Sequence, residues 1–527
     1  MENMKRILSI LLAVVMLLSL SVCAFADGEV VRDSIVVAET GEWWGADVTQ
    51  LDGTSSFQRL MGEPLCVKAP DGSILPNVCS EVTVSDDYLT ITMTIPEGLY
   101  FYNGEQLEPE DVVASLKRMQ EVSPFSANFA VFTDIVEDGR NVILTLDHYS
   151  SDAYTSLTQS FLAIFDKDEL ESKTDEQLYW DCHPYGQYYL KEYVSGAYVV
   201  LARNPGFKCF NPFVENQGPA QIEEITVRWI SEEFTMAQEF NAGNIQYIAN
   251  ISPDGAAQIT AENAVVNLVL HNPNIYYIEL KLDDDVIGDE VIRKAIALAI
   301  DREELCEMYN NNIIPAYSFA TSTIQNYSEQ AAEEYKAEFC NDAEKANALL
   351  DEAGYIDTDG DGIREKDGMP LIIKFVYGQT PVDTIVCQGL QIQLQEKIGI
   401  YLELEEQEDN YHYESLANGD FQIGMSRFNT ADTVQLFQWV LCYFPSFDYL
   451  SDYGCDGEDA FFALCDTLAQ EPDQNNRTAI VYDLEKLVCG SVLVIPVFTN
   501  RVNIVYDSAV TPGIYMGDGQ IFYNDLK

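Results

Sequence analysis

Segments with the periodicity of a β-strand alternate with segments with the periodicity of an α-helix along most of this 527-residue chain. Residues 81–95 alternate apolar and polar side chains, and residues 109–119 then carry apolar side chains at helical spacing behind a proline. Further strand patterns cover 142–146, 188–202, 222–229, 371–377 and 401–405, and further helix patterns cover 234–240, 289–309, 342–353 and 386–398. This interleaving predicts a mixed α/β protein.

The first 26 residues have the pattern of a signal peptide. Two basic residues at 5–6 precede an apolar run at 7–20, and residues 24–26 supply the small side chains that a signal peptidase requires. We therefore expect residues 1–26 to be removed and the mature protein to lie outside the cytoplasm, extracellular or on the periplasmic or cell-surface side. The alternative is a lipoprotein anchored through Cys23, although Val22 stands where a lipobox has a small residue. No later stretch approaches the ~20 apolar residues of a membrane span.

Charge and cysteine content exclude some classes of partner and site. The formal net charge of −57 repels phosphate backbones, so we expect no nucleic-acid partner. Cleavage after Ala26 would leave eleven of the twelve cysteines, an odd number that keeps at least one thiol free, and the spacing does not indicate which cysteines pair. The four histidines are scattered and no CxxC motif is present, so no zinc cluster is visible.

Four stretches, in a fixed order, carry recognisable motifs. They are VSDDYLTITMTIPEGLYFYNGEQLEPEDVVASLKRM at 84–119, YGQYYLKEYVSGAYVVLARNP at 185–205, RKAIALAIDREEL at 293–305 and AEKANALLDEAG at 343–354. Together they resemble the extracellular solute-binding proteins of the oligopeptide/dipeptide ABC-transporter type, family 5. In the first stretch, Pro96 and Glu97 stand where the family has a basic residue, and Tyr102-Asn103 replace its His-Asp pair.

The resemblance implies an α/β fold of two lobes, the periplasmic-binding-protein-like fold of type II, class C, with an extra small domain inserted in the first lobe. It implies a first lobe made of residues 27–70, 186–273 and 494–527, with the extra domain at 71–185. The second lobe would be 274–493. A ligand would be enclosed between the lobes when they close about a hinge.

The resemblance also implies where ligand contacts lie. In peptide-binding members, an aspartate after a short conserved segment pairs with the α-amino group of the peptide, and the matching stretch here is Phe428 to Asp432. Asp432 is therefore the expected partner of a ligand amine, with a solvated loop aspartate as the alternative. Arg427 is a candidate partner for a ligand carboxylate. Trp43 and Trp44 lie in the segment that borders the cleft in the family, and either could contact the ligand.

The segment from Asp357 to Gly362 has the first half of a calcium-binding loop. Asp357, Asp359 and Asp361 alternate, and glycine permits the sharp turn, but Gly368 stands where a bidentate glutamate would complete the loop. The alternatives are a structural calcium site and an acidic connecting turn. We expect no other cofactor.

The resulting hypothesis is a substrate-binding protein of an ABC importer that captures a small solute, most readily a peptide, and delivers it to the membrane permease. We expect a monomer that meets the membrane only through the permease. Alternatives within the family are a ligand-presenting sensor or a nickel- or sugar-binding member. The alternative from another class is a secreted hydrolase, but the chain contains no HExxH, GxSxG or GxxxxGK[ST] motif, so we expect no enzyme.

Overall fold

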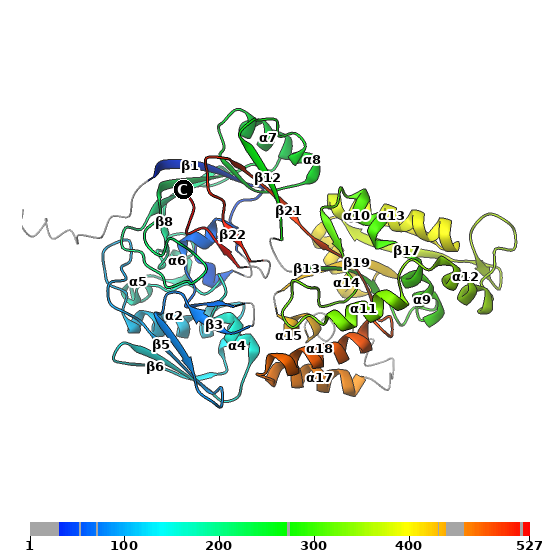
Figure 1. Ribbon diagram of the computed structural model, residues 1–527, viewed down its shortest axis with the longest axis horizontal. Coiled ribbons are helices and arrows are strands. Elements are labelled where there is room, and N and C mark those ends of the chain that lie inside the picture. Colours follow the sequence, from blue (N-terminus) through cyan, green and yellow to red (C-terminus); the bar gives the residue numbers. More distant parts are fainter. Residues whose placement is uncertain are drawn as a thin grey trace, which may run out of the picture.

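The computed structural model describes residues 31–51, 54–69, 72–270, 274–430, 432–438, 458–516 and 520–527. It consists of two lobes joined by strands (Figure 1). Residues 1–26, expected to be a signal peptide, and with them Cys23 lie outside the described residues. Within the described ranges, none of the helices combines the length and the apolar character needed to cross a bilayer.

The first lobe is built on a seven-stranded mixed sheet in the order β12-β21-β11-β1-β10-β9-β8. Its central strand, β1, pairs in parallel with β10 and β11, while the outer pairs are antiparallel. The strands are β1 (Arg32–Glu39), β8 (Tyr188–Val194), β9 (Tyr198–Arg203), β10 (Ile222–Trp229), β11 (Tyr247–Ile251), β12 (Ala264–Val269) and β21 (Val502–Asp507). β21 comes from the end of the chain and lies between β11 and β12.

A smaller antiparallel sheet, β4-β5-β7-β6, forms a separate core beside the first. Its strands are β4 (Glu81–Val84), β5 (Thr90–Thr94), β6 (Phe132–Asp138) and β7 (Asn141–Leu146). The helix α2 (Pro109–Val122) packs on this sheet through Val112, Leu116 and Met119, and a capping box between Glu108 and Asp111 fixes its start. Two short hairpins, β2 (Cys66–Lys68) with β3 (Ile74–Pro76) and β22 (Ile514–Tyr515) with β23 (Ile521–Phe522), adjoin it.

The remaining helices of this half of the chain are short. They are the 3₁₀ helices η1 (Val48–Gln50) and η2 (Gln58–Met61) and the α-helices α3 (Ser126–Phe129), α4 (Ser151–Ser156), α5 (Lys167–Ser172), α6 (Asp175–Leu178), α7 (Glu233–Asn241) and α8 (Pro253–Ala256).

The second lobe has a six-stranded mixed sheet in the order β14-β20-β13-β19-β17-β18. These strands are β13 (Asn274–Leu280), β14 (Ile313–Pro315), β17 (Ile372–Gly378), β18 (Tyr401–Gln407), β19 (Ile423–Asn429) and β20 (Val494–Asn500). The helices around it are α9 (Glu290–Ala299), α10 (Arg302–Met308), α11 (Glu329–Glu338), α12 (Ala343–Glu352), α13 (Pro381–Ile398), α14 (Asp409–Asn418), α15 (Thr433–Gln438), α17 (Glu458–Gln470) and α18 (Gln474–Val488). A small hairpin, β15 (Glu365–Lys366) with β16 (Met369–Pro370), precedes β17.

Three sequence-based expectations need correction. Residues 81–95 form a hairpin rather than one strand, because Ser85 and Asp87 build a turn in which Tyr88 takes a φ of 59°. The helix expected at 289–309 is two helices, because Ile300 is extended and the Asp301 side chain caps a new start at Arg302. Residues 494–500 were expected in the first lobe, but they form β20 in the second sheet, because their apolar side chains are buried there.

Candidate functional site

The two lobes are joined where neighbouring strands run from one sheet into the other. β12 pairs with β21 and β13 pairs with β20, so the outgoing and returning segments lie side by side. A reciprocal contact ties them: the Asn500 amide donates to the Asn274 side chain at 2.8 Å, and the Asn274 side chain donates to the Asn500 carbonyl at 3.2 Å. Only Arg501 separates β20 from β21. Such a narrow strand connection is suited to hinge bending.

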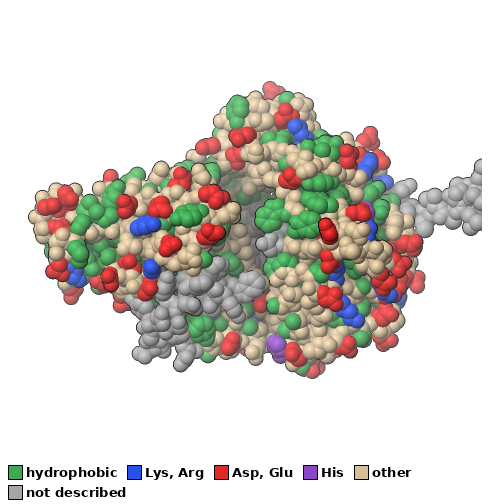
Figure 2. Space-filling model, turned by 180° about the vertical axis from the view of Figure 1, so that it is seen from behind, with side chains coloured by type: hydrophobic (Ala, Val, Ile, Leu, Met, Phe, Trp, Pro, Cys, Tyr) green, Lys and Arg blue, Asp and Glu red, His purple; other side chains and the backbone are tan. Residues whose placement is uncertain are grey.

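A hollow lies between the lobes, as the space-filling view in Figure 2 shows. Away from the hinge, the lobes meet where α4 contacts α15 and α17. They also meet at Gly72, in the turn of the β2–β3 hairpin, where an added Cβ would come within 2.3 Å of Gln325 and 2.9 Å of Gln474. The hollow is therefore bounded by the hinge and by contacts between the lobes, as a cleft for an enclosed ligand must be.

Asp432 lies at this contact between the lobes, at the start of α15. Its side chain is 1% exposed, which excludes the alternative of a solvated loop aspartate. One carboxylate oxygen, Oδ1, accepts hydrogen bonds from the amides of Val434 at 2.7 Å and Gln435 at 3.3 Å. The other, Oδ2, accepts a 3.3 Å hydrogen bond from the Thr155 hydroxyl of α4, in the first lobe. Among the described residues, no cationic side chain forms an ion pair with Asp432.

A second carboxylate, that of Asp152, faces Asp432 from the first lobe. Burial raises the pKa of Asp152 well above its usual range, the nearby Asp432 carboxylate raises it further, and the Arg477 charge opposes both. Arg477 is fully buried, and its guanidinium donates to Asn326 and to the Leu468 carbonyl. The contact between the lobes thus brings together two acidic groups, one from each lobe, near a buried cation.

Sequence reasoning missed Asp152, Thr155 and Arg477. Ser150 caps α4, and a serine followed by Asp152 in the first turn is a helix-start signal that could have located this short helix. Nothing in the local sequence shows that α4 meets a segment almost 280 residues later in the chain.

Arg427, on β19, is already engaged by the second lobe. Its Nε donates to the Tyr413 hydroxyl at 3.1 Å, its guanidinium lies over the Tyr413 ring, and Nη1 is 3.6 Å from the buried Asp383 carboxylate. Burial opposes its charge, but Tyr276, Tyr413 and Asp383 together raise the pKa of Arg427. The structure places it in an internal network, and its contact with a ligand carboxylate stays a prediction.

The two tryptophans differ sharply in exposure. Trp43 is buried in the core of the first lobe, and its indole N–H donates to Glu39 at 2.7 Å. Trp44 is 71% exposed. Of the two, Trp44 has a free face to offer a ligand, and its contact with one stays a prediction.

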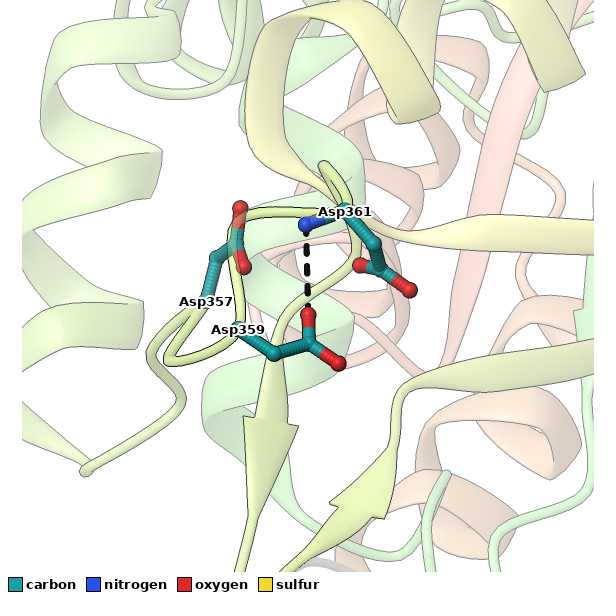
Figure 3. Close-up of side chains that lie close together, drawn as sticks. All are labelled: Asp357, Asp359 and Asp361. Atoms are coloured by element: carbon teal, nitrogen blue, oxygen red, sulfur yellow. Dashed lines mark hydrogen bonds between the residues drawn. The ribbon is translucent and has the colours of Figure 1, made fainter.

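The three aspartates of the acidic loop do lie together (Figure 3). One oxygen from each of Asp357, Asp359 and Asp361 lies within 4.8 Å of the others, which is compatible with a shared calcium ion at 2.3–2.6 Å from each oxygen. All three side chains are exposed, and each accepts a hydrogen bond from a backbone amide within the loop. Among the described residues this is the one group of three or more potential metal ligands, and it lies in the loop between α12 and β17, at the end of the second lobe that is far from the first lobe (Figure 1).

Comparison with known proteins gives a consistent picture. The model of the middle region of bacterial extracellular solute-binding proteins, family 5, matches residues 73–444. The glutathione-binding protein GsiB of Salmonella typhimurium is 27% identical over 319 residues, which cover 59% of this chain and 58% of that protein. The dipeptide-binding protein DppE of Bacillus subtilis is 21% identical over 457 residues, covering 81% of this chain and 79% of that protein.

The same fold occurs in solved structures. NikA from Brucella suis, in complex with Fe(III)-EDTA, superposes with a TM-score of 0.78 at 20% identity, covering 94% of this chain and all of NikA. At this level of identity the likeness shows the fold, which is that of a two-lobed periplasmic binding protein.

Proposed function

This chain belongs to family 5 of the bacterial extracellular solute-binding proteins, and from this premise we propose that it captures a small peptide between its two lobes for an ABC importer. Members of the family are solute-binding proteins of transport systems rather than enzymes. The proposal for this chain is the same: binding without chemical change, delivery to a membrane permease, and a role for the mature protein as an exported monomer.

The observation that carries the proposal is the buried carboxylate of Asp432 at the contact between the lobes. A charge taken out of water needs a compensating charge, and among the described residues Asp432 has no ion-pair partner. The α-ammonium group of a peptide supplies one. The facing Asp152 carboxylate, with its raised pKa, adds a second acidic group from the opposite lobe.

The hinge explains how such a ligand would act on the protein. An amine held between Asp432 of the second lobe and Asp152 of the first touches both groups only when the lobes are together. A ligand with contacts of this kind binds the closed state more tightly and shifts the population towards it. The permease would then meet a closed, loaded form.

A peptide is favoured over a directly coordinated metal because the described histidines already have hydrogen-bond or ion-pair partners within the protein. His412 is buried, with one ring nitrogen at Gln407 and the other at the Met425 carbonyl, and His183 lies beside Glu169. His148 pairs with Asp147, and His271 lies outside the described residues. The names of two relatives, a glutathione-binding and a dipeptide-binding protein, also favour ligands with amide and amine groups.

We propose no resident cofactor. A calcium ion at Asp357, Asp359 and Asp361 would have a structural role, since it would hold the loop between α12 and β17. This loop lies at the end of the second lobe that is far from the first lobe.

The test is binding by the purified mature protein, with recovery of the ligand. Native mass spectrometry identifies co-purified molecules, and a thermal-shift screen with di- to pentapeptides measures stabilisation of about 2.7 kcal/mol at a hundred times Kd. We expect tight binding of at least one peptide, recovered intact after release. Hydrolysis of the bound peptide would support the hydrolase alternative. Stabilisation by nickel complexes or sugars but by no peptide would exclude the peptide assignment.

A further inference from the structure

Two cysteines in the first half of the chain lie in sulfur–sulfur contact. The Sγ atoms of Cys66 and Cys79 are 4.0 Å apart, and both side chains are fully buried. Cys340, Cys489 and Cys209 contact a tyrosine, a glutamate and an asparagine instead. Among the described cysteines, the structure therefore brings the sulfurs of one pair together, where the spacing in the sequence indicates no pairing.

The backbone segments that carry the two cysteines are direct neighbours. Cys66 lies in β2, and Cys79 lies two residues before β4. The amides of Val78 and Cys79 approach the carbonyl of Leu65, the neighbour of Cys66, at 3.1 and 3.4 Å, so the two backbones already lie side by side. A disulfide requires an S–S distance of about 2.05 Å and Cα atoms about 4.4–6.8 Å apart. The two sulfurs, 4.0 Å apart, would have to approach each other by about 2 Å to form it.

The two thiols are also chemically unequal. The Cys66 thiol lies at hydrogen-bond distance from Cys79, which lowers the pKa of Cys79 and raises that of Cys66. Cys79 is thus the better nucleophile of the pair. Because extracytoplasmic compartments are oxidising, an adjacent pair of this kind tends to be linked there.

We propose that Cys66 and Cys79 form a disulfide in the exported protein, made by exchange with a small-molecule disulfide such as oxidised glutathione. The Cys79 thiolate attacks one sulfur of the oxidant, giving a mixed disulfide and releasing one glutathione thiolate. The Cys66 thiol then loses its proton and attacks the Cys79 sulfur, forming the internal bond and releasing the second glutathione. The two cysteines are oxidised and the glutathione disulfide is reduced to two thiols.

Burial of both sulfurs sets the time at which the bond forms. Neither thiol is exposed in the folded protein, so oxidation takes place during folding or when the β2–β3 hairpin opens locally. Once made, the bond closes a loop that contains the whole hairpin. That hairpin supports the C-terminal segment, because the backbone of Lys68 exchanges two hydrogen bonds with the Gln520 side chain, each 2.9 Å long.

Mass spectrometry of the mature chain tests the proposal directly. Trypsin cleaves after Arg59, Lys68 and Lys117, which places Cys66 in peptide 60–68 and Cys79 in peptide 69–117, with one cysteine in each. After folding with oxidised and reduced glutathione, we expect these two peptides to run as one linked species, two hydrogens lighter than their sum, that separates on reduction. Absence of the linked species, or linkage of Cys66 to another cysteine, would overturn the proposal.

A thermal measurement supplies a second readout. A bond that restricts the unfolded chain should raise Tm by several degrees when the oxidised protein is compared with the reduced one. The difference should vanish in the Cys66→Ser and Cys79→Ser variants and persist in Cys387→Ser, which removes a buried thiol in the other lobe. An equal oxidised-to-reduced difference in all three variants would contradict the assignment. The mass measurement on the parent protein stands even where a variant folds poorly.

Discussion

Replacing Asp432 with asparagine should separate the stability of the protein from its affinity for a ligand amine. Asparagine keeps the side-chain oxygen that accepts from Val434 and Gln435 at the start of α15, and asparagine and aspartate are equally good caps. The change also removes the negative charge that faces Asp152, the carboxyl whose pKa is raised by burial and by Asp432. We therefore expect the unliganded variant to have a Tm equal to or above that of the parent.

Affinity should fall in the same variant. Removing the charge from one partner of a buried charge pair costs about 2–5 kcal/mol. Because Asp152 remains beside the ligand amine, we expect the lower end, about 2 kcal/mol, or a loss of roughly 30-fold at 1.4 kcal/mol per factor of ten. The double change with Asp152→Asn should approach the upper end of several thousand-fold.

The assay is calorimetry with the tightest-binding peptide of the screen and with its N-acetyl form, which lacks the amine charge. The parent should prefer the free amine, and Asp432→Asn should lose most of that preference. Asp420→Asn, a change of the same kind on an exposed loop, controls for net charge. If Asp432→Asn bound the free-amine peptide as tightly as the parent, or lost affinity for the free-amine and N-acetyl peptides by the same factor, the assignment of Asp432 to the amine would be refuted.

Three further outcomes follow from the structure. Burial raises the pKa values of Glu63 and Glu485 to about 7. Since the folded state favours their protonated forms, their contribution to the free energy of unfolding is complete below pH ~4.5 and is lost as the pH rises through about 7. The loss should be roughly 3 kcal/mol per group, and urea unfolding at pH 5 and pH 8 will measure it. Gly186→Ala should destabilise the first lobe by about 3 kcal/mol, because its Cβ would lie 2.2 Å from the Met61 carbonyl oxygen; a denaturation midpoint equal to the parent's would contradict this packing. Removing calcium with EDTA should leave the peptide Kd unchanged, because the loop at 357–361 lies at the end of the second lobe far from the first lobe, and a shift in Kd measured by calorimetry would be inconsistent with that position.

Local patterns located several of the regular elements. The strand expected at 222–229 is β10, and the helix expected at 342–353 is α12 with Asp342 as its cap, because periodicity and capping act over a few residues. One error arose where two helices follow each other with almost no gap, at Ile300 and Asp301. There the apolar pattern runs on, and only the capping aspartate marks the break.

The sequence alone predicted less of the candidate ligand site than of the fold. The resemblance indicated Asp432, and the structure puts it at the contact between the lobes, but its role as a cap of α15 and its contact with Thr155 depend on tertiary packing. Asp152 and Arg477 are far apart in the chain and belong to different lobes. No short-range pattern links residues that meet only because a hinge brings two sheets together.

The position of β21 has a consequence for the order in which the protein assembles during synthesis. A chain made from its N-terminus completes residues 274–500 before residues 502–507, so the second lobe has all of its strands before the first lobe does. Until residues 502–507 arrive, β12 has no partner in its sheet and the edge of β11 stays open. Unpaired edges of this kind are prone to aggregation. A product that stops short of residue 502 should therefore have a complete sheet in the second lobe and an aggregation-prone first lobe, in which β11 and β12 are not joined.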